Sequence, residues 1–417
     1  MRRTVARRAR LLAILAILGP GMITANAGND AGGIATFASV GAEFGYSLLW
    51  ILIPITISLG IVQEMCARMG AVTGKGLSDL IRERFGVRWT AVIMLSLLIA
   101  NAGVTVSEFV GIAAAAELFG VSHFVAVPLA AILVWWLVAK GSYKKVEKAF
   151  LLMSLVFLGY IVSAFLARPD WSAVGAGFVR PTFKLEHAFV FTLVAMIGTT
   201  ISPYMQVYVQ SSVVDKGVTA DNYAATKKDV WIGNTFSSLV VFFIIVSTAA
   251  TLYKAGVQIS TAADAGRALR PLAGRYAETL FGLGLFGASM LAAGVVPLAT
   301  AYSISEALGF EKGVSHTFRE APIFLGTFTF LVAVGAAIAV IPNLPLFRVL
   351  LVTQVINGLL LPIVLFAILR LVNNRELMGA QVNGPLYNAA AWLTAIVVTA
   401  LSVLYIVMTI FPRLVRL

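Results

Sequence analysis

Two long apolar stretches of this sequence are interrupted, the first by Gly28-Asn29-Asp30-Ala31-Gly32-Gly33 and the second by Gly198-Thr199-Thr200-Ile201-Ser202-Pro203-Tyr204. Glycines weaken a helix, and Pro203 removes a backbone donor and clashes with the preceding turn. Inside a bilayer, backbone groups that such a break leaves free are tolerated only where they line a cavity or are buried in protein. The two breaks therefore predict either a functional site or a pair of ordinary kinks.

The composition of the chain excludes several classes of protein. Of the 417 residues, 59% are hydrophobic and 12% are charged, against about 25% charged in a soluble domain, and the mean hydropathy is +0.92. A soluble enzyme and a disordered chain are therefore excluded. The single Cys66 excludes an internal disulfide, and three distant histidines argue against a histidine metal cluster. The composition is that of a polytopic membrane protein.

Runs of about 20 apolar residues can cross a bilayer, and eleven such spans are expected. They lie near 11–41, 45–67, 90–119, 122–139, 149–167, 189–213, 231–253, 277–307, 321–341, 346–370 and 389–411. With the N-terminus in the cytoplasm and the C-terminus outside, about two thirds of the 31 Lys and Arg residues fall in inner loops, as the positive-inside rule requires. The basic start resembles a signal peptide, but no cleavage site follows it, so we expect a retained first span.

The breaks fall in spans one and six, which begin two units of five helices each. Interrupted helices at matching positions of two halves are typical of inverted-repeat transporters. A carboxylate such as Asp30 in the middle of a span costs about 2.5–3.5 kcal/mol on the insertion scale and is a functional candidate by default. We hypothesise that the two breaks face each other and form a cation site.

Four sequence motifs now point to a family. They are Gly19-Pro20-Gly21 with Asp30-Ala31-Gly32-Gly33; Gln63 to Gly70 with Thr73-Gly74-Lys75; Ser107-Glu108-Phe109-Val110-Gly111; and Gln354-Val355-Ile356-Asn357-Gly358 ending in Leu361-Pro362. Together they resemble helices one, two, three and ten of the Nramp divalent-metal transporters. The resemblance implies an all-α LeuT-type fold of eleven transmembrane helices. Its inverted repeats would be residues 1–167 and 168–371, with an additional helix in 372–417.

The sixth helix departs from the family pattern. The family motif A-x-x-M-P-H supplies a methionine sulfur to the metal, but here the methionine position is Ser202 and the histidine position is Tyr204. The asparagine that closes the family's DPGN motif is Gly33. The pattern looks like that of the Nramp-related magnesium transporters. A thioether favours softer ions, whereas carboxylate, carbonyl and water suit Mg²⁺, which usually keeps several of its waters.

The expected site follows from this resemblance and from the breaks. Asp30 is the charged ligand, the backbone carbonyls of Ala27 and Thr199 are further ligands, and Gly33 widens the site. Ser202 is either a ligand or a hydroxyl that satisfies a freed carbonyl. Gln354 either reaches the ion or makes an interhelical hydrogen bond. The predicted metal-site residues are Ala27, Asp30, Gly33, Thr199, Ser202 and Gln354, and the predicted helix-break residues are Gly32, Gly33 and Pro203.

Two further deep carboxylates, Glu64 and Glu108, are candidates for a proton pathway or for structural acids. In the family, acidic groups on the third helix and the sixth-helix histidine are associated with proton movement. Glu108 is kept here, but the acidic residue three positions before it is Thr105, and the histidine is Tyr204. We therefore expect weak or absent proton coupling.

The sequence thus predicts a transporter, not an enzyme, that moves Mg²⁺ and Mn²⁺ by alternating access in a prokaryotic inner membrane. The metal is the substrate, and no cofactor is expected. The expected partners are the ion and membrane lipids, with no nucleic acid and no obligatory protein partner. The alternatives are a proton-coupled Mn²⁺/Fe²⁺ importer, a LeuT-type sodium/amino-acid symporter and a non-transporting sensor. ATP-driven pumping is excluded because the sequence has no Walker loop.

Overall fold

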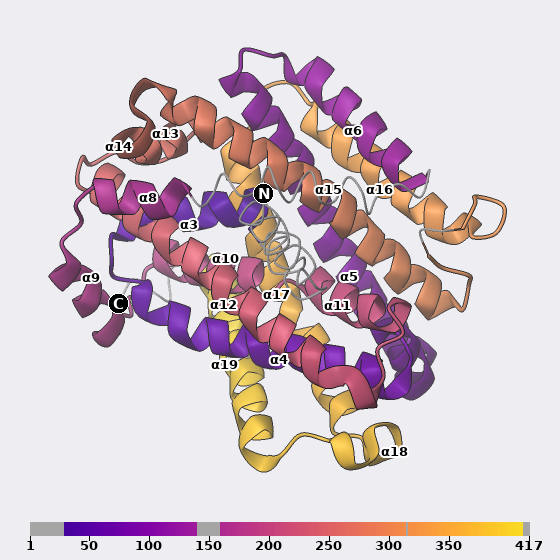
Figure 1. The fold of residues 1–417 in the computed structure, drawn as a ribbon. Coiled ribbons are helices and arrows are strands. Elements are labelled where there is room, and N and C mark those ends of the chain that lie inside the picture. The colour runs from indigo at the N-terminus through magenta and orange to yellow at the C-terminus, as the bar shows by residue number, and fades with distance from the viewer. Residues whose placement is uncertain (1–28, 140–158, 314–315, 412–417) are drawn as a thin grey trace, which may run out of the picture.

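The computed structural model describes residues 29–139, 159–313 and 316–411, and every regular element in these ranges is helical (Figure 1). The long helices are α3 (Ala31–Phe44), α4 (Leu52–Thr73), α5 (Leu77–Leu118), α6 (His123–Ala139), α10 (His187–Thr200), α11 (Pro203–Asp215), α12 (Tyr223–Thr248), α15 (Ala277–Leu308), α16 (Pro322–Ala339), α17 (Leu346–Val372) and α19 (Pro385–Ile410). The shorter ones are η1 (Leu49–Ile51), α8 (Gly159–Leu166), α9 (Trp171–Val179), η3 (Ala220–Asn222), η4 (Ala249–Tyr253), α13 (Ala262–Gly266), η5 (Arg267–Leu269), α14 (Arg270–Ala273), η6 (Gly274–Tyr276), α18 (Arg375–Met378) and η7 (Gly379–Gln381).

The expected spans agree with these helices wherever the chain is described. Eight helical segments among the described residues are long and apolar enough to cross a membrane. The first and fifth expected spans are described only in part, as α3 and α8, because residues 11–28 and 149–158 lie outside the described ranges. The count of eleven therefore stays a prediction. The short helices α9, α13 and α14 were not expected from hydropathy, because they lie in the polar connections between spans.

The broken helix formed by α10 and α11 lies at the centre of the molecule, and α19 lies at its edge. Within the apolar 18-residue stretch of each segment, 83% of the residues are buried for 187–215, but only 28% are buried for α19. Helix α10 packs against α17 and α3, and α11 packs against α4, α5 and α15. At the opposite edge, α6 and α16 lie side by side (Figure 1). The break is therefore enclosed by helices on all these sides.

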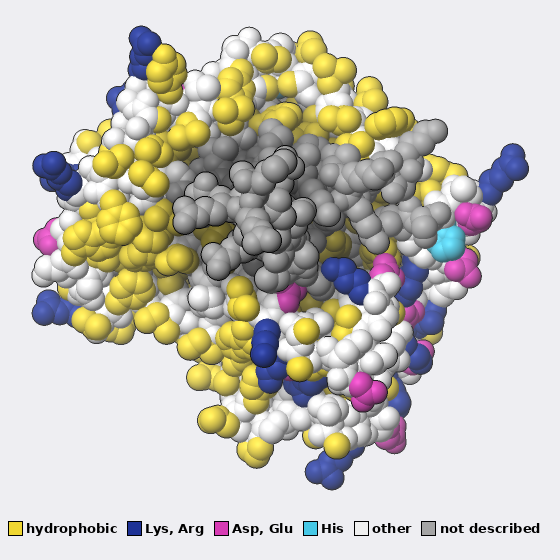
Figure 2. Space-filling model, viewed as in Figure 1, with side chains coloured by type: hydrophobic (Ala, Val, Ile, Leu, Met, Phe, Trp, Pro, Cys, Tyr) yellow, Lys and Arg dark blue, Asp and Glu magenta, His cyan; other side chains and the backbone are white. Residues whose placement is uncertain are grey.

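The outer surface is that of an integral membrane protein. Hydrophobic side chains cover much of the visible face, and charged side chains gather mainly toward one end of it (Figure 2). Large apolar side chains such as Leu95, Leu129, Ile132 and Leu393 are more than half exposed. Water would penalise this exposure, whereas lipid chains accept it.

Two glycines bring α10 and α17 into backbone contact. A Cβ at Gly198 would strike the carbonyl oxygen of Gln354 and the amide nitrogen of Gly358, and a Cβ at Gly358 would strike the carbonyl oxygen of Val194. Small residues of this kind allow membrane helices to pack closely. The contact fixes α17 directly beside the end of α10.

We expect Gly198→Ala to destabilise the protein, because the atoms that oppose the new methyl group are backbone atoms. Overpacking of this kind costs about 1–3 kcal/mol. Gly326→Ala is the matched control, since a methyl group added to this helical glycine would meet no other atom within 4 Å. Thermal unfolding in detergent should show a lower midpoint for Gly198→Ala alone. Equal midpoints for the two variants would contradict the close approach.

Candidate functional site

The first break ends at Asp30, which caps the N-terminus of α3. Its Oδ1 atom accepts a hydrogen bond of 2.6 Å from the backbone N–H of Gly33. The positive end of the helix dipole favours a carboxylate at this position. Gly32 and Gly33 were expected to lie in the break, but they lie in the first turn of α3. The cap at Asp30 starts the helix at Ala31, before the two glycines.

Gly32 has a role in packing. A Cβ at Gly32 would strike the carboxamide of Gln354. The absence of a side chain therefore lets α17 approach the first turn of α3, two residues along the chain from Asp30. Residue 27 lies outside the described ranges, so the predicted Ala27 carbonyl has no structural account.

The second break lies between α10, which ends at Thr200, and α11, which begins at Pro203. Pro203 occupies the first helical position, where its missing N–H costs nothing. Ser202 directly precedes α11, and its Oγ lies 2.8 Å from the carbonyl oxygen of Gly198 and 3.2 Å from that of Thr199. The single hydroxyl hydrogen is shared between these two carbonyls, which the break frees, and this is the second of the two roles considered for Ser202.

The helices α3, α10, α11 and α17 bring most of the predicted site residues into one buried region. The side chains of Asp30, Thr199, Ser202 and Gln354 are fully buried. Within the described part of the chain, three of their polar atoms have no hydrogen-bond partner: Asp30 Oδ2, Thr199 Oγ1 and Gln354 Nε2. Buried polar groups are normally paired, so these atoms mark a place where a polar guest would be bound.

Glu108 lies closer to this region than the sequence indicated. Its Oε2 atom accepts a hydrogen bond of 3.2 Å from the backbone N–H of Ala31, at the start of α3. Its Oε1 atom has no partner among the described residues, and Asp30 and Glu108 are near enough to act on each other electrostatically. The site therefore has two neighbouring carboxyl groups, and one of them supports the helix that the other caps.

A residue outside the predicted set, Asn357, connects α17 to the second break. Its Nδ2 atom donates to Ser202 Oγ at 3.0 Å and to the carbonyl oxygen of Gly198 at 3.3 Å. The sequence offered one indication of this role: Asn357 follows Gln354 by three residues, so the two side chains lie on one side of the helix.

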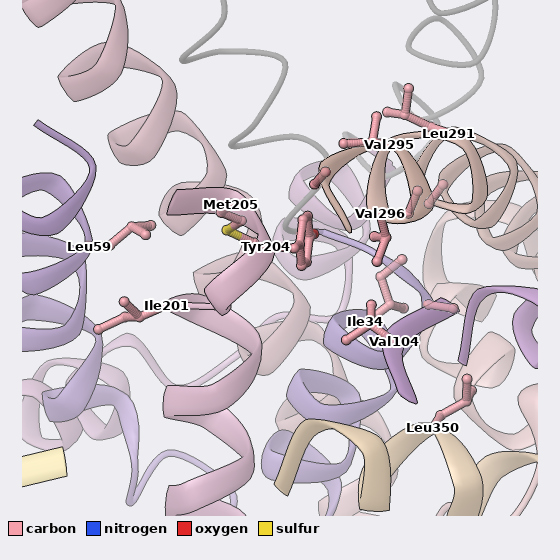
Figure 3. Packing of buried hydrophobic residues seen from close by; sticks show 14 of the residues in the cluster. Ile34, Leu59, Val104, Ile201, Tyr204, Met205, Leu291, Val295, Val296 and Leu350 are labelled. Carbon is pink, nitrogen blue, oxygen red and sulfur yellow. The ribbon is translucent and has the colours of Figure 1, made fainter. Parts of the chain in front are cut away.

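Met205 and Tyr204 are neighbours in α11, but their side chains point in different directions. Figure 3 shows Met205 and Ile201 toward Leu59, and Tyr204 toward Val296. The Met205 sulfur accepts a weak hydrogen bond of 3.8 Å from Gln63 Nε2. Asn29, Thr200 and Met205 also line a cavity of about 20 Å³, enough for about one water molecule.

Glu64 has the contacts of a structural acid. It forms an ion pair of 3.2 Å with Arg68, and the Tyr223 hydroxyl donates to it at 2.8 Å. Arg68 also donates to Asn383 Oδ1 at 2.5 Å and to the carbonyl oxygen of Gln381. The pair thus ties α4 to α12 and to the connection before α19.

A further buried acid, Glu306, was missed by the sequence reasoning. Its carboxylate accepts hydrogen bonds from the Ser211 hydroxyl at 2.7 Å and the Ser78 N–H at 3.2 Å, and it pairs with Lys312 at 3.0 Å. Burial lowers the pKa of Lys312, but Glu306 and Asp79 outweigh this effect and hold the pKa above its ordinary value. Lys312 therefore stays charged and joins the start of α5 to the end of α15, while Glu306 holds α11 through Ser211.

We expect Arg68→Met to destabilise the protein strongly, because it leaves the Glu64 carboxylate buried without its partner. Breaking one side of a buried pair costs about 3–5 kcal/mol. The double variant Glu64→Gln/Arg68→Met should recover much of this loss, as measured by thermal unfolding in detergent. If the double variant were as unstable as Arg68→Met, the charge of Glu64 would not be the cause.

Comparison with known proteins agrees with this geometry. The sequence model of the family described as "Natural resistance-associated macrophage protein-like" (Nramp) matches residues 21–408. The chain is 30% identical over 399 residues to the "Divalent metal cation transporter MntH" of Yersinia enterocolitica, covering 93% of this chain and 94% of that protein. It is 27% identical to the protein of the same name from Deinococcus radiodurans, over 93% and 89% of the two chains.

Solved structures show the same fold. A mutant of the manganese transporter of Eremococcus coleocola superposes with a TM-score of 0.75 at 20% identity, over 96% of this chain and 88% of that one. MhsT in complex with L-phenylalanine superposes with a TM-score of 0.59 at 15% identity, over 93% and 97%. At these identities the likeness shows the fold alone, and that fold is the LeuT type.

Proposed function

This chain belongs to the Nramp family, and from that membership we propose that it is a membrane transporter of divalent metal cations that carries Mg²⁺, and also Mn²⁺, by alternating access. The observation that carries the proposal is Asp30: its carboxylate is fully buried at a helix break, and its Oδ2 atom has no partner among the described residues. A cation is the guest that such an oxygen favours.

The charge of the region supports a cation over an anion. Asp30 and Glu108 are both carboxyl groups, and α10 directs its C-terminal carbonyls, the negative end of the helix dipole, toward the break. Broken membrane helices commonly bind ions through such carbonyls. These carboxyl groups and carbonyl dipoles would repel the carboxylate of an amino acid, which argues against an amino-acid symporter.

The donor atoms favour a hard ion. Ser202 stands where the family pattern has a methionine, the amide of Asn357 contacts its hydroxyl, and Gln354 contacts Asn357 in turn, so these side chains offer oxygen atoms and no sulfur. No group of three or more His, Cys, Asp or Glu side chains suited to a metal occurs in the described ranges. A site of oxygen donors with few charges suits Mg²⁺ that keeps part of its water shell.

The second candidate is a proton-coupled importer of Mn²⁺ or Fe²⁺, a reading that the divalent-metal names of the relatives leave open. Met205 is the observation that favours it, because its sulfur is adjacent in sequence to the break and its side chain lines a cavity with Asn29, the neighbour of Asp30. A thioether there would select softer ions. Against this candidate, the contact with Gln63 gives the sulfur a protein partner already.

The surroundings of Glu108 support weak or absent proton coupling. One turn before it on α5, the Thr105 hydroxyl donates to the carbonyl oxygen of Asn101 at 2.8 Å. On α16, Gly335 packs closely against Thr105 and Phe109, and α16 has no titratable side chain, so the titratable groups that act on Glu108 electrostatically are Asp30 and Tyr204. The membrane potential supplies about 2.3 kcal/mol per charge per 100 mV, so inward flux of a divalent ion needs no proton.

The proposed arrangement in the membrane follows the charge distribution of the sequence. We infer a cytoplasmic N-terminus and an external C-terminus in a bacterial inner membrane, with repeats at 1–167 and 168–371 and an additional helix in 372–417. The ion is the substrate and membrane lipids surround the apolar surface. We infer neither an enzymatic activity nor a cofactor, nucleic acid or obligatory protein partner.

Purified protein in liposomes should take up Mg²⁺ in a saturable manner, read with an interior Mg²⁺ indicator, and Mn²⁺ in a parallel assay. We expect Asp30→Ala to abolish both, because the site then loses its capping carboxylate. Asp221→Ala is the matched control, since Asp221 is exposed on the short helix η3. Uptake of Mn²⁺ without Mg²⁺ by the wild type would favour the second candidate instead.

Lowering the external pH should leave Mg²⁺ uptake unchanged, and an interior pH indicator should show no acidification that depends on Mg²⁺. Glu108→Gln should behave in the same way, because its amide oxygen can still accept from the Ala31 N–H. Metal-dependent acidification that Glu108→Gln removes would instead assign Glu108 to a proton pathway. The membrane potential is clamped with potassium and valinomycin in both experiments.

A further inference from the structure

Asn357 makes a set of contacts that no other described residue at the site makes. Its Nδ2 atom faces both sides of the second break: the Gly198 carbonyl in the last turn of α10 and the hydroxyl of Ser202, the residue that precedes α11. A third, longer contact of 3.5 Å leads to Gln354 Oε1 on its own helix. One carboxamide thus connects the two half-helices to each other and to α17.

The orientation of this carboxamide follows from its partners. The Gly198 carbonyl can only accept, so the nitrogen of Asn357 must face it. The Ser202 hydroxyl donates to a carbonyl of α10 and is left with its lone pairs, so it accepts from the same nitrogen. With the nitrogen fixed in this way, the amide oxygen must point elsewhere.

That oxygen has no partner. Asn357 Oδ1 is fully buried and, within the described ranges, has no hydrogen-bond partner. Two other buried atoms also lack a hydrogen-bond partner in the described ranges: Asp30 Oδ2 at the start of α3 and Thr199 Oγ1 in α10. Helix α17 packs against both of these helices. A buried acceptor without a partner destabilises the protein, so this oxygen points to a guest that donates hydrogen bonds.

A metal ion donates no hydrogen bond, but the water molecules bound to it do. We propose that Asn357 is a positioning and selectivity residue: its nitrogen holds Gly198 and Ser202 in place, and its oxygen accepts a hydrogen bond from water on the transported ion. This inference rests on the proposed function, and it adds a residue that recognises the hydration shell. Since Mg²⁺ gives up its water reluctantly, the contact favours Mg²⁺ over ions that dehydrate more easily.

The place of Asn357 depends on the glycine contacts between α10 and α17. Gly198 and Gly358 allow the two backbones to touch, and Asn357 is next to Gly358 in the sequence. A short carboxamide reaches across such a contact, whereas at an ordinary interhelical distance it would fall short. The hydrogen bonds of Asn357 to the break therefore depend on the close packing that Gly198 and Gly358 allow.

The test compares Asn357→Leu, which has a similar volume but no polar atoms, with Asn373→Leu. Asn373 is a matched control because it terminates the same helix and also donates two hydrogen bonds, to Leu369 and Asn388, far along the chain from the break. Initial rates of Mg²⁺ and Mn²⁺ uptake are measured in liposomes over a range of concentrations. A Tm in detergent shows whether each variant is folded.

We expect Asn357→Leu to raise the KM for Mg²⁺ about tenfold, to raise the KM for Mn²⁺ less, and to change kcat little. The tenfold figure is of the size that loss of one or two interhelical hydrogen bonds gives. Asn373→Leu should keep the wild-type ratio of the two KM values. Asn357→Ser, which keeps a small polar group, replaces Asn357→Leu if the latter does not fold, and it should shift the ratio in the same direction.

An unchanged ratio of the two KM values in a folded Asn357 variant would overturn the inference, whether both values rise equally or neither changes. The failure of the proposed function looks different. In that case the wild type itself transports no Mg²⁺, and the role of Asn357 is then read from the KM for Mn²⁺ alone. An unchanged KM for Mn²⁺ in that case would also overturn the inference.

Discussion

The carboxylate of Asp30 is surrounded by protein in the interior of a membrane protein, and the rest of the site depends on how its charge is tolerated. One oxygen is held by the first turn of α3, and the helix dipole favours a negative group there. The other oxygen has no protein partner in the described ranges. Burial of an unpaired charge is unfavourable, and the proposed cation would relieve this cost by binding the free oxygen.

Much of the fold was predictable because bilayer thickness and backbone hydrogen bonding leave a membrane chain few choices. The break at Pro203 followed from local chemistry in the same way, whereas the start of α3 directly after Asp30 did not, because Gly32 and Gly33 were expected to lie in the break. The roles of Gly32, Asn357 and Glu306 did not, because each is defined by a neighbour far away in the sequence. Gly32 needs Gln354, Asn357 needs Gly198, and Glu306 needs Ser78. Hydropathy and spacing contain no information about such pairs.

Ser202 stands where the resembled family pattern has a methionine, and its hydroxyl makes demands on the helices around it that a thioether would not. A methionine sulfur needs no hydrogen bond when buried, whereas a serine hydroxyl and the freed carbonyls beside it do. Ser202 meets this need by bonding to Gly198 and Thr199, and Asn357 completes it. A serine at this position therefore requires polar support from α17, because without Asn357 the buried groups beside Ser202 would lose a hydrogen-bond partner.

Contacts at the break differ in strength from contacts away from it. At the break, neutral hydroxyl, amide and carbonyl groups bond to one another, and such bonds between membrane helices contribute about 0.6 kcal/mol on average. Away from the break, Glu64 pairs with Arg68 within α4 and Glu306 pairs with Lys312 after the end of α15, and breaking a buried pair costs about 3–5 kcal/mol. The proposed ion at Asp30 would exchange the weak bonds for its own contacts, while the ion pairs and their hydrogen bonds hold the surrounding helices together. Conformational change on transport is therefore expected to begin at the break.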